Sequence, residues 1–311
     1  MKTLNIQHLK FICTALALSI ILGCGGAANL ANKTALELFT MGKKAYDDKK
    51  YIQSTNYFQA IVYNHGGESF VDTAQHYLAM SYFGNKDYGV AAVEFNRLAL
   101  NYPSSVYFEN GIFMRAVCYY ETSPGHQGLD QTEMLKALGQ LEDFVIDFPE
   151  SPLVVQARQY LALGNGRIAK KYYESGLVYK RIGGYTAAQK YFQIVLDDYT
   201  DSEQAPKSLF EIAEINLKLN KYPEARAGFD NFVTLFSGHE LARKAAGGSR
   251  EAAFKNGVLA FNKGELGAAK ERFEIFIKDF PDDNRVGSAK EYLSKIEDKQ
   301  SHLTEDGHAE S

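Results

Sequence analysis

One helix pattern recurs six times along this chain of 311 residues. Each copy places apolar residues at i, i+3, i+4 and i+7, which is one face of an α-helix, with His65 as a polar exception at the end of the first copy. A proline, glycine, serine or threonine follows eight residues after the first apolar residue. These first apolar residues, which we call the anchors, are Phe58, Phe95, Leu141, Phe192, Phe229 and Phe273.

Small residues recur at two fixed distances before the anchors. Four residues before them stand Ser54, Ala91, Ala137, Ala188, Ala225 and Ala269, and sixteen before five of them stand Gly42, Ala79, Gly176, Ala213 and Gly257. Small residues at two such points let two helices cross closely. The repeating unit is therefore a helix, a short turn and a second helix. One such hairpin cannot bury its apolar face alone, so the hairpins must stack.

This spacing resembles the tetratricopeptide repeat (TPR). The resemblance implies an all-α fold of TPR-like helix-hairpin repeats stacked in a right-handed superhelix, an α-solenoid with a concave groove. The anchors lie 37, 46, 51, 37 and 44 residues apart, whereas a regular repeat has about 34 residues. Insertions account for the difference: residues 121–132 lengthen the loop of the third hairpin, and a long helix from about Pro152 to Arg181 opens the fourth repeat.

The N-terminus has the features of an export signal. Lys2 and Lys10 precede an apolar run that ends at Cys24. This run has about the length of a signal-peptide core and is too short for a typical transmembrane helix. The sequence ILGC resembles the bacterial lipobox, in which the cysteine is lipidated and becomes the first mature residue. The alternative is an ordinary cleaved signal in which Cys24 is incidental. The residue after this cysteine is Gly25, which resembles the pattern of lipoproteins that are sorted to the outer membrane.

These observations predict five segments. They are a lipoprotein signal peptide (1–23), a flexible tether (24–33), five TPR-like repeats (34–236), an additional helix-hairpin repeat (237–299) and a disordered tail (300–311). Apart from Cys13 in the signal and Cys24, the chain has one cysteine, Cys118, so no disulfide framework exists. Its apolar surroundings predict a buried, inert thiol.

Little in the sequence indicates catalysis or nucleic-acid binding. The formal net charge is −4 and no basic field covers the chain, so nucleic acid is not an expected partner. The seven histidines are scattered and form no metal motif. Residues 164–167, GNGR, lack the strand and the third glycine of a dinucleotide loop and are expected to lie in a helix. We therefore expect no enzyme activity, no cofactor and no metal.

Two stretches carry a closer resemblance. DQTEMLKALGQLEDFVIDFPESPLVVQARQYL and AKKYYESGLVYKRIGGYTAAQKYFQIVLDDYTDS are similar to the BamD/YfiO family, the TPR lipoproteins of the β-barrel assembly machine. The resemblance covers roughly residues 34–236. It implies a scaffold that is lipid-anchored in the outer membrane, faces the periplasm and binds the periplasmic domains of the barrel-forming assembly protein. It also implies recognition of unfolded outer-membrane protein clients.

The resemblance suggests two groups of binding residues. Client recognition is linked in the family to the groove of the first repeats, where the candidates on first helices are Tyr46, Phe83, Arg115 and Tyr120. Residues 64–70, NHGGESF, depart from the aromatic, proline-bearing turn that the family often has there. Binding of the barrel-forming protein maps to about Tyr172–Tyr199, with the candidates Tyr172, Tyr173, Tyr179, Lys180, Arg181, Tyr185 and Tyr191. Tyrosine and arginine are good recognition residues because they combine large area with a polar tip.

Two other functions compete with this interpretation. A TPR envelope protein could coordinate cell-wall synthesis with envelope constriction, but that class usually lacks a lipobox and often has an N-terminal coiled coil. An enzyme would need a catalytic domain, and no segment of 60 or more residues is free of the helix-repeat pattern.

Overall fold

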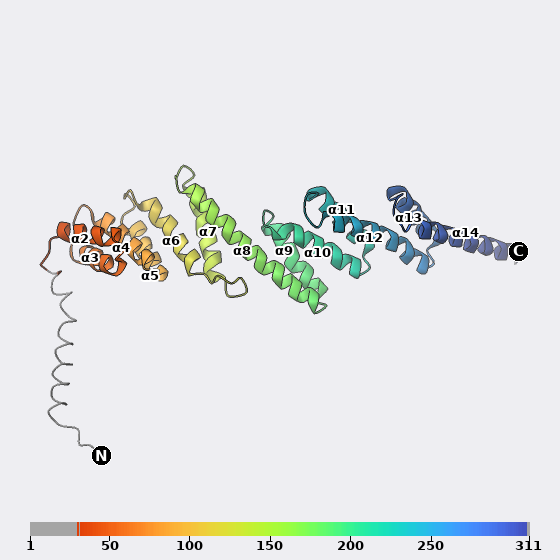
Figure 1. The fold of residues 1–311 in the computed structure, drawn as a ribbon, viewed down its shortest axis with the longest axis horizontal. Coiled ribbons are helices and arrows are strands. Elements are labelled where there is room, and N and C mark those ends of the chain that lie inside the picture. The colour runs from red at the N-terminus through yellow and green to blue at the C-terminus, as the bar shows by residue number, and fades with distance from the viewer. Residues whose placement is uncertain (1–29, 31, 310–311) are drawn as a thin grey trace, which may run out of the picture. The chain divides into compact units, whose positions relative to one another are not determined.

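The structure, a computed structural model, describes Leu30 and residues 32–309 (Figure 1). Cys24, the predicted signal peptide and most of the predicted tether lie outside these residues. Throughout the described part of the chain, each regular element is an α-helix. The helices divide into two compact units between Gly164 and Asn165, inside one long helix.

The first unit consists of three helix hairpins and the start of α8. Its helices are α2 (Ala35–Asp47), α3 (Tyr51–Asn64), α4 (Val71–Gly84), α5 (Tyr88–Asn101), α6 (Phe108–Thr122), α7 (Thr132–Asp147) and the first part of α8 (Val154–Arg181). A capping box starts α2, because Thr34 Oγ1 accepts from Glu37 N while Glu37 Oε2 accepts from Thr34 N at 2.8 Å.

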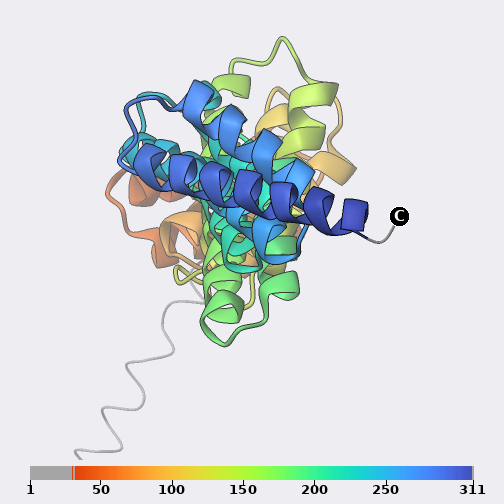
Figure 2. The same cartoon turned by 90° about the vertical axis from the view of Figure 1, so that its right-hand side faces the viewer.

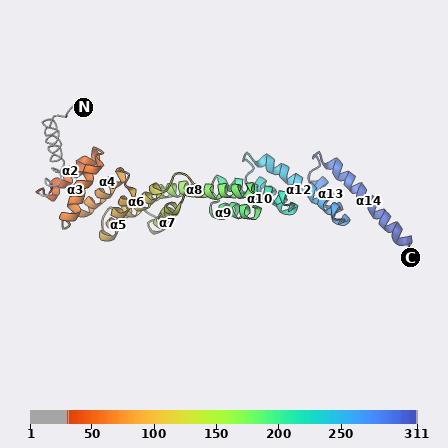
Figure 3. The same cartoon turned by 90° about the horizontal axis from the view of Figure 1, so that it is seen from below.

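The second unit continues the same hairpin pattern. It contains the rest of α8, α9 (Tyr185–Asp198), α10 (Gln204–Lys218), α11 (Tyr222–Leu235), α12 (Ala242–Asn262), α13 (Leu266–Asp279) and α14 (Val286–Ala309). Figures 2 and 3 show α14 crossing beside α13 and ending at the C-terminus. The segment 300–311, for which the sequence predicts disorder, is helical as far as Ala309.

The turns inside the hairpins share one backbone feature. A residue with positive φ stands two positions before the second helix in five of them: Lys49, Lys86, Gly183, Asn220 and Gly264. This left-handed conformation reverses the chain in a few residues, and glycine adopts it without steric cost. The third hairpin, which has the inserted loop, lacks this turn.

The anchors form the core of each hairpin. All six are 0% exposed, as are the small residues four positions before them. A Cβ at Gly42 would lie 3.0 Å from the Phe58 ring, and one at Gly257 would lie 2.7 Å from the Phe273 ring. Larger side chains would thus hold the two helices of a hairpin apart. The prediction of an all-α fold of stacked TPR-like hairpins is confirmed within each unit.

Candidate protein-binding surfaces

Two of the predicted client-groove residues close the turn of their own hairpin. Tyr46 and Phe83 both stand twelve residues before an anchor. The Tyr46 ring packs edge-on against Tyr51 at 5.7 Å, and the Phe83 ring packs in the same way against Tyr88 at 5.2 Å. Both side chains are half-buried. The outer edge of each ring is therefore the part left for a ligand.

The other two predicted groove residues lie on α6. Arg115 Nε donates to Gln140 Oε1 at 3.0 Å, and its Nη1 donates to Asn96 Oδ1 at 2.7 Å. The guanidinium thereby joins α5, α6 and α7. Tyr120 packs edge-on against Tyr160 of α8 at 5.0 Å. Both residues are half-buried and hold neighbouring helices together.

A row of tyrosines lies where α8 packs against α9. We call Tyr179, Tyr191, Tyr172 and Tyr199 the tyrosine row. Tyr179 stacks on Tyr191 with centroids 5.2 Å apart and planes at 15°, and Tyr172 lies 6.3 Å from Tyr191 and 6.0 Å from Tyr199. The neighbouring Tyr179 phenol is the main cause that raises the pKa of Tyr191.

The end of α8 adds exposed apolar area to this row. Val178 and Tyr179 are exposed, and Ile182 is 72% exposed in the turn that follows. Arg181 is also exposed. The result is a surface of aromatic and aliphatic groups with a cation at its edge, a composition that suits protein recognition.

Three further predicted partner residues serve the packing of the second unit. Tyr173 packs against Phe192 at 5.6 Å, and burial raises the pKa of its phenol to about 12. Lys180 forms an ion pair with Glu211 of α10. The Nζ atom of Lys218 lies 5.2 Å from the centre of the Tyr185 ring.

Sequence reasoning missed three members of this surface. Tyr199, Val178 and Ile182 lie within the predicted region Tyr172–Tyr199 but are not among the candidates named in it. A signal for the two aliphatic residues was present, since they add apolar groups near Tyr179 at positions outside the repeat pattern. Their exposure marks them as surface residues.

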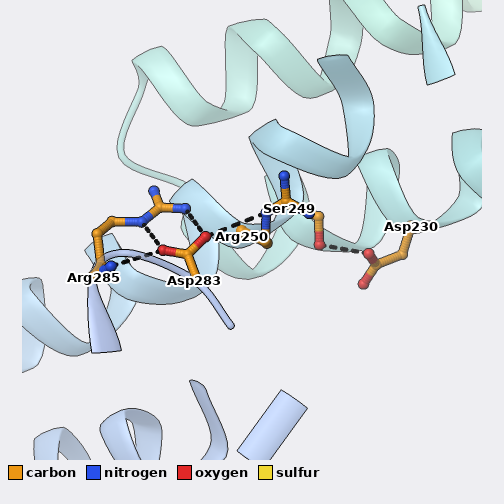
Figure 4. Close-up of polar contacts among 5 residues, drawn as sticks. All are labelled: Asp230, Ser249, Arg250, Asp283 and Arg285. Atoms are coloured by element: carbon orange, nitrogen blue, oxygen red, sulfur yellow. Dashed lines mark hydrogen bonds and ion pairs between the residues drawn. The ribbon is translucent and has the colours of Figure 1, made fainter. Parts of the chain in front are cut away.

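A polar network in the second unit is structural. Arg285 Nε and Nη2 donate to the two oxygens of Asp283 at 2.7 and 2.8 Å, and Arg250 Nε lies 3.3 Å from the same carboxylate (Figure 4). Hydrogen bonds from Arg285 are the main cause that lowers the pKa of Asp283 to about 2. Ser249 Oγ donates to Asp230 Oδ1 at 2.5 Å. The Arg250–Asp283 pair fixes the loop before α14 onto α12, and the Ser249–Asp230 bond joins α12 to α11.

The described residues contain neither a candidate metal site nor a helix that could span a membrane. No group of three or more His, Cys, Asp or Glu side chains in this part of the chain could hold a metal ion. None of the helices from α2 to α14 has a stretch that is both long and apolar enough to cross a membrane.

Stacked helix hairpins of this kind define a helix-repeat protein. The family model YfiO, described as outer membrane lipoprotein, matches residues 31–228, and the chain therefore belongs to the YfiO family. The match includes α2 to α10 and the first half of α11, so α12, α13 and α14 lie beyond it. The family predicted from the sequence is confirmed.

Two curated relatives are each named outer membrane protein assembly factor BamD. The one from Caulobacter vibrioides is 24% identical over 224 residues, which are 69% of this chain and 72% of the relative. The one from Rickettsia prowazekii is 23% identical over 222 residues, which are 70% of this chain and 87% of the relative.

Solved structures of TPR proteins are also similar to this chain. The TPR2AB domain of yeast Sti1 covers 85% of this chain and is itself covered to 98%, with 11% identity and a TM-score of 0.39. A TPR repeats protein from Bacteroides fragilis covers 86% and is covered to 99%, with 12% identity and a TM-score of 0.36.

Proposed function

We propose that this chain is a scaffold subunit of the outer-membrane β-barrel assembly complex. It is anchored by lipid on Cys24, faces the periplasm and binds the periplasmic domains of the barrel-forming assembly protein. Membership of the YfiO family and the names of the two curated relatives support this proposal. The lipobox-like sequence before Cys24 supports the anchor.

The observation that carries the proposal is the tyrosine row, of which Tyr179 is exposed and the other members are half-buried. It lies within the residues matched by the family model. Tyr179 is more than one-third exposed and stacks on a second tyrosine, so its ring is held in place before a partner arrives. A pre-ordered aromatic group loses little conformational entropy on binding and offers a large contact area. Val178 and Ile182 supply apolar area beside it.

Client recognition is proposed for the first unit. The half-exposed edges of Tyr46, Phe83 and Tyr120 offer aromatic surface, and Arg115 offers a cation on α6. Such groups suit a peptide that ends in an aromatic residue. No catalytic residue is part of the proposal.

Site-specific crosslinking tests partner binding directly. A photoreactive amino acid replaces Val178 or Ile182 in the full chain, in its own membranes, and crosslinked proteins are identified by mass spectrometry. The expected product contains a large barrel protein with periplasmic domains. Thr186, exposed on α9, is the matched control position. Crosslinks only to cell-wall synthases or constriction proteins would replace this proposal with the envelope-constriction function.

The anchor has its own test. A Cys24→Ala variant should be released as a soluble periplasmic chain or remain an uncleaved precursor, because a lipoprotein cysteine carries the acyl chains. Membrane fractionation and labelling with radioactive palmitate measure both properties. If the variant still incorporates palmitate and sediments with the outer membrane, the lipid is attached elsewhere.

A further inference from the structure

The outward face of α5 differs from those of the other second helices. At the exposed positions five and two residues before its anchor and five after it, α5 has Val90, Val93 and Leu100. Val93 is 50% exposed and Leu100 is 71% exposed. The same three positions of α11 hold Glu224, Ala227 and Thr234. The row on α5 is therefore apolar where the equivalent row in the second unit is mostly polar.

The neighbouring outward face of α3 is uncharged. It carries Gln53, Asn56, Ala60, Tyr63 and Asn64. Tyr63 is 58% exposed, and its hydroxyl accepts a hydrogen bond from Arg97 Nη1 of α5 at 3.1 Å. The two faces are thus continuous. We call Gln53, Asn56, Tyr63, Val90, Val93 and Leu100 the α3–α5 face.

The one charged side chain on this face is already neutralised. Arg97 Nη1 lies 2.8 Å from Glu94 Oε1, and Glu94 is buried. The other oxygen of Glu94 accepts from Gln75 Nε2 at 2.9 Å. The cation is therefore held against the protein by a buried acid. An apolar surface can approach this face without leaving the Arg97 charge unpaired.

Leu30, the first of the described residues, lies at the same face. Leu30 packs against the core cluster around Phe58, and it lines an open groove of about 570 Å³ together with Gln53, Asn56 and Tyr63. Cys24 is six residues before Leu30. Six extended residues span about 22 Å at most. The Cα atom of Cys24, from which any acyl group extends, therefore stays within that distance of the point where Leu30 meets α3.

We propose that the α3–α5 face lies against the lipid surface of the membrane, as a second contact beside the anchor. This proposal rests on the proposed lipidation of Cys24. Val90, Val93 and Leu100 would enter the interfacial region, where Tyr63 would stay at headgroup level because one end of its ring is apolar and the other polar. The face has no free cation, so it suits neutral headgroups. Three small apolar groups bind weakly alone, and the tether raises their effective concentration.

A tethered vesicle experiment tests the contact. A hexahistidine tag replaces Cys24 and binds the mature chain to phosphatidylcholine vesicles that contain nickel-chelating lipid. An environment-sensitive fluorophore is attached through Val93→Cys, and brominated lipids serve as the quencher. Cys118 does not interfere, because it is buried and burial raises the pKa of its thiol to about 12. The control is Glu121→Cys, labelled in the same way at an exposed position of α6 outside the α3–α5 face.

If the contact forms, the emission of the fluorophore at Val93→Cys should shift to the blue on tethered vesicles and be quenched by the brominated lipids. The fluorophore at Glu121→Cys should show neither effect. Adding Leu100→Glu to the labelled variant should reduce the quenching, whereas Glu121→Gln should not. Emission at Val93→Cys that matches the control on tethered vesicles would overturn the proposal. Crosslinking of the same position to a protein in native membranes would then identify a protein occupant. The artificial tether makes this result independent of Cys24 lipidation and of partner binding at α8–α9.

Discussion

The two units build the same hairpins with different interiors. In the first unit, the small residues that meet between the first two hairpins are Ser54 and Ser81, whose hydroxyl oxygens lie 2.7 Å apart. At the equivalent positions the second unit has Ala225 and Ala252. The first unit also buries Gln75, His76 and Glu94 between α4 and α5, whereas the main charged network of the second unit fixes a loop.

This difference shows that the repeat tolerates buried polar groups: neighbours satisfy Ser54, Ser81 and Gln75, whereas Nδ1 of His76 has no hydrogen-bond partner among the described residues. A buried hydrogen bond contributes about 1 kcal/mol net, and an unsatisfied buried group costs about as much or more. Both units therefore have a core of phenylalanine and alanine, and the first adds buried polar pairs such as Ser54–Ser81 and Gln75–Glu94 to it. The predictions below separate the contributions of this core and of these pairs.

The largest effect is expected from an anchor of the second unit. Phe229→Ala removes a fully buried ring that packs against Phe210 at 5.6 Å. Unfolding of the second unit should become easier by about 3–5 kcal/mol. Hydrogen exchange should show lost protection in α10, α11 and α12 and unchanged protection in α3, α4 and α5. Leu235→Ala, an exposed change on the same helix, is the control. Equal loss in both units would show that they do not unfold separately.

A smaller effect is expected from the polar network of the first unit. Gln75→Leu removes a donor from buried Glu94 and leaves its carboxylate with Arg97. The loss should be about 1–3 kcal/mol, because the carboxylate stays buried with fewer donors. Urea unfolding of the variant measures it.

The matched control removes a polar pair completely. Ser54→Ala combined with Ser81→Ala recreates the Ala225–Ala252 arrangement and should change stability little, because no hydroxyl is left without its partner. A double variant as unstable as Gln75→Leu would contradict the idea that an apolar pair can replace the Ser54–Ser81 pair without loss of stability.

Acid should destabilise the first unit before the second. Burial is the main cause that lowers the pKa of His76 to about 4, from an ordinary value of 6.5, although Asp72 acts in the opposite direction. Between pH 6.5 and 4, His76 binds a proton in the unfolded chain but not in the folded chain. The free energy of unfolding therefore decreases as the pH is lowered through this range. The expected loss from pH 7 to pH 5 is about 2 kcal/mol.

The second unit should keep its stability to a lower pH than the first unit. The pKa of Asp283 is lowered to about 2 from 3.8, so its contribution is lost only as pH falls through that range. His76→Phe keeps a ring against Tyr107, which lies 4.1 Å away, and should flatten the pH dependence of the first unit. Hydrogen exchange at pH 7 and pH 5 follows each unit. An unchanged pH dependence in the variant would assign the acid sensitivity to another group.

The smallest effect is expected inside α8. Gly166→Ala should stabilise the helix by about 1 kcal/mol, because an added Cβ meets nothing within 4 Å and alanine favours helix. Gly164→Ala should do the opposite, because its Cβ would lie 2.5 Å from Leu138 Cδ2. Thermal unfolding of both variants compares them. Equal shifts of the midpoint would mean that α7 and α8 do not pack closely at Gly164.

Sequence patterns predicted the fold because packing between hairpins depends on residue size at fixed spacing. The anchors and the small residues before them are all buried, and the third loop lies where the insertion indicates. The end of the chain was harder to predict, since the polar composition of residues 300–311 indicates disorder and α14 continues to Ala309. Side-chain composition alone does not set where a terminal helix ends.

The roles of single binding candidates could not be read from the sequence. Tyr172 and Tyr173 are adjacent and chemically identical, and both pack against the cluster around Val195, yet Tyr173 also contacts Phe192 whereas Tyr172 contacts Tyr191 and Tyr199. Neighbouring helix positions differ by about 100° around the axis, so the crossing of α9 decides between them. Arg115 looked available for a ligand because its partners, Asn96 and Gln140, lie on other helices.

Co-purification from native membranes tests the central claim most directly. Tagged full-length protein is extracted in mild detergent, and the accompanying proteins are identified by mass spectrometry. The account predicts a large barrel protein with periplasmic domains, retained with Thr186→Ala and lost when Tyr179→Ala and Tyr191→Ala are combined in a chain that still folds. Recovery of cell-wall synthases or constriction proteins without that barrel protein would contradict it.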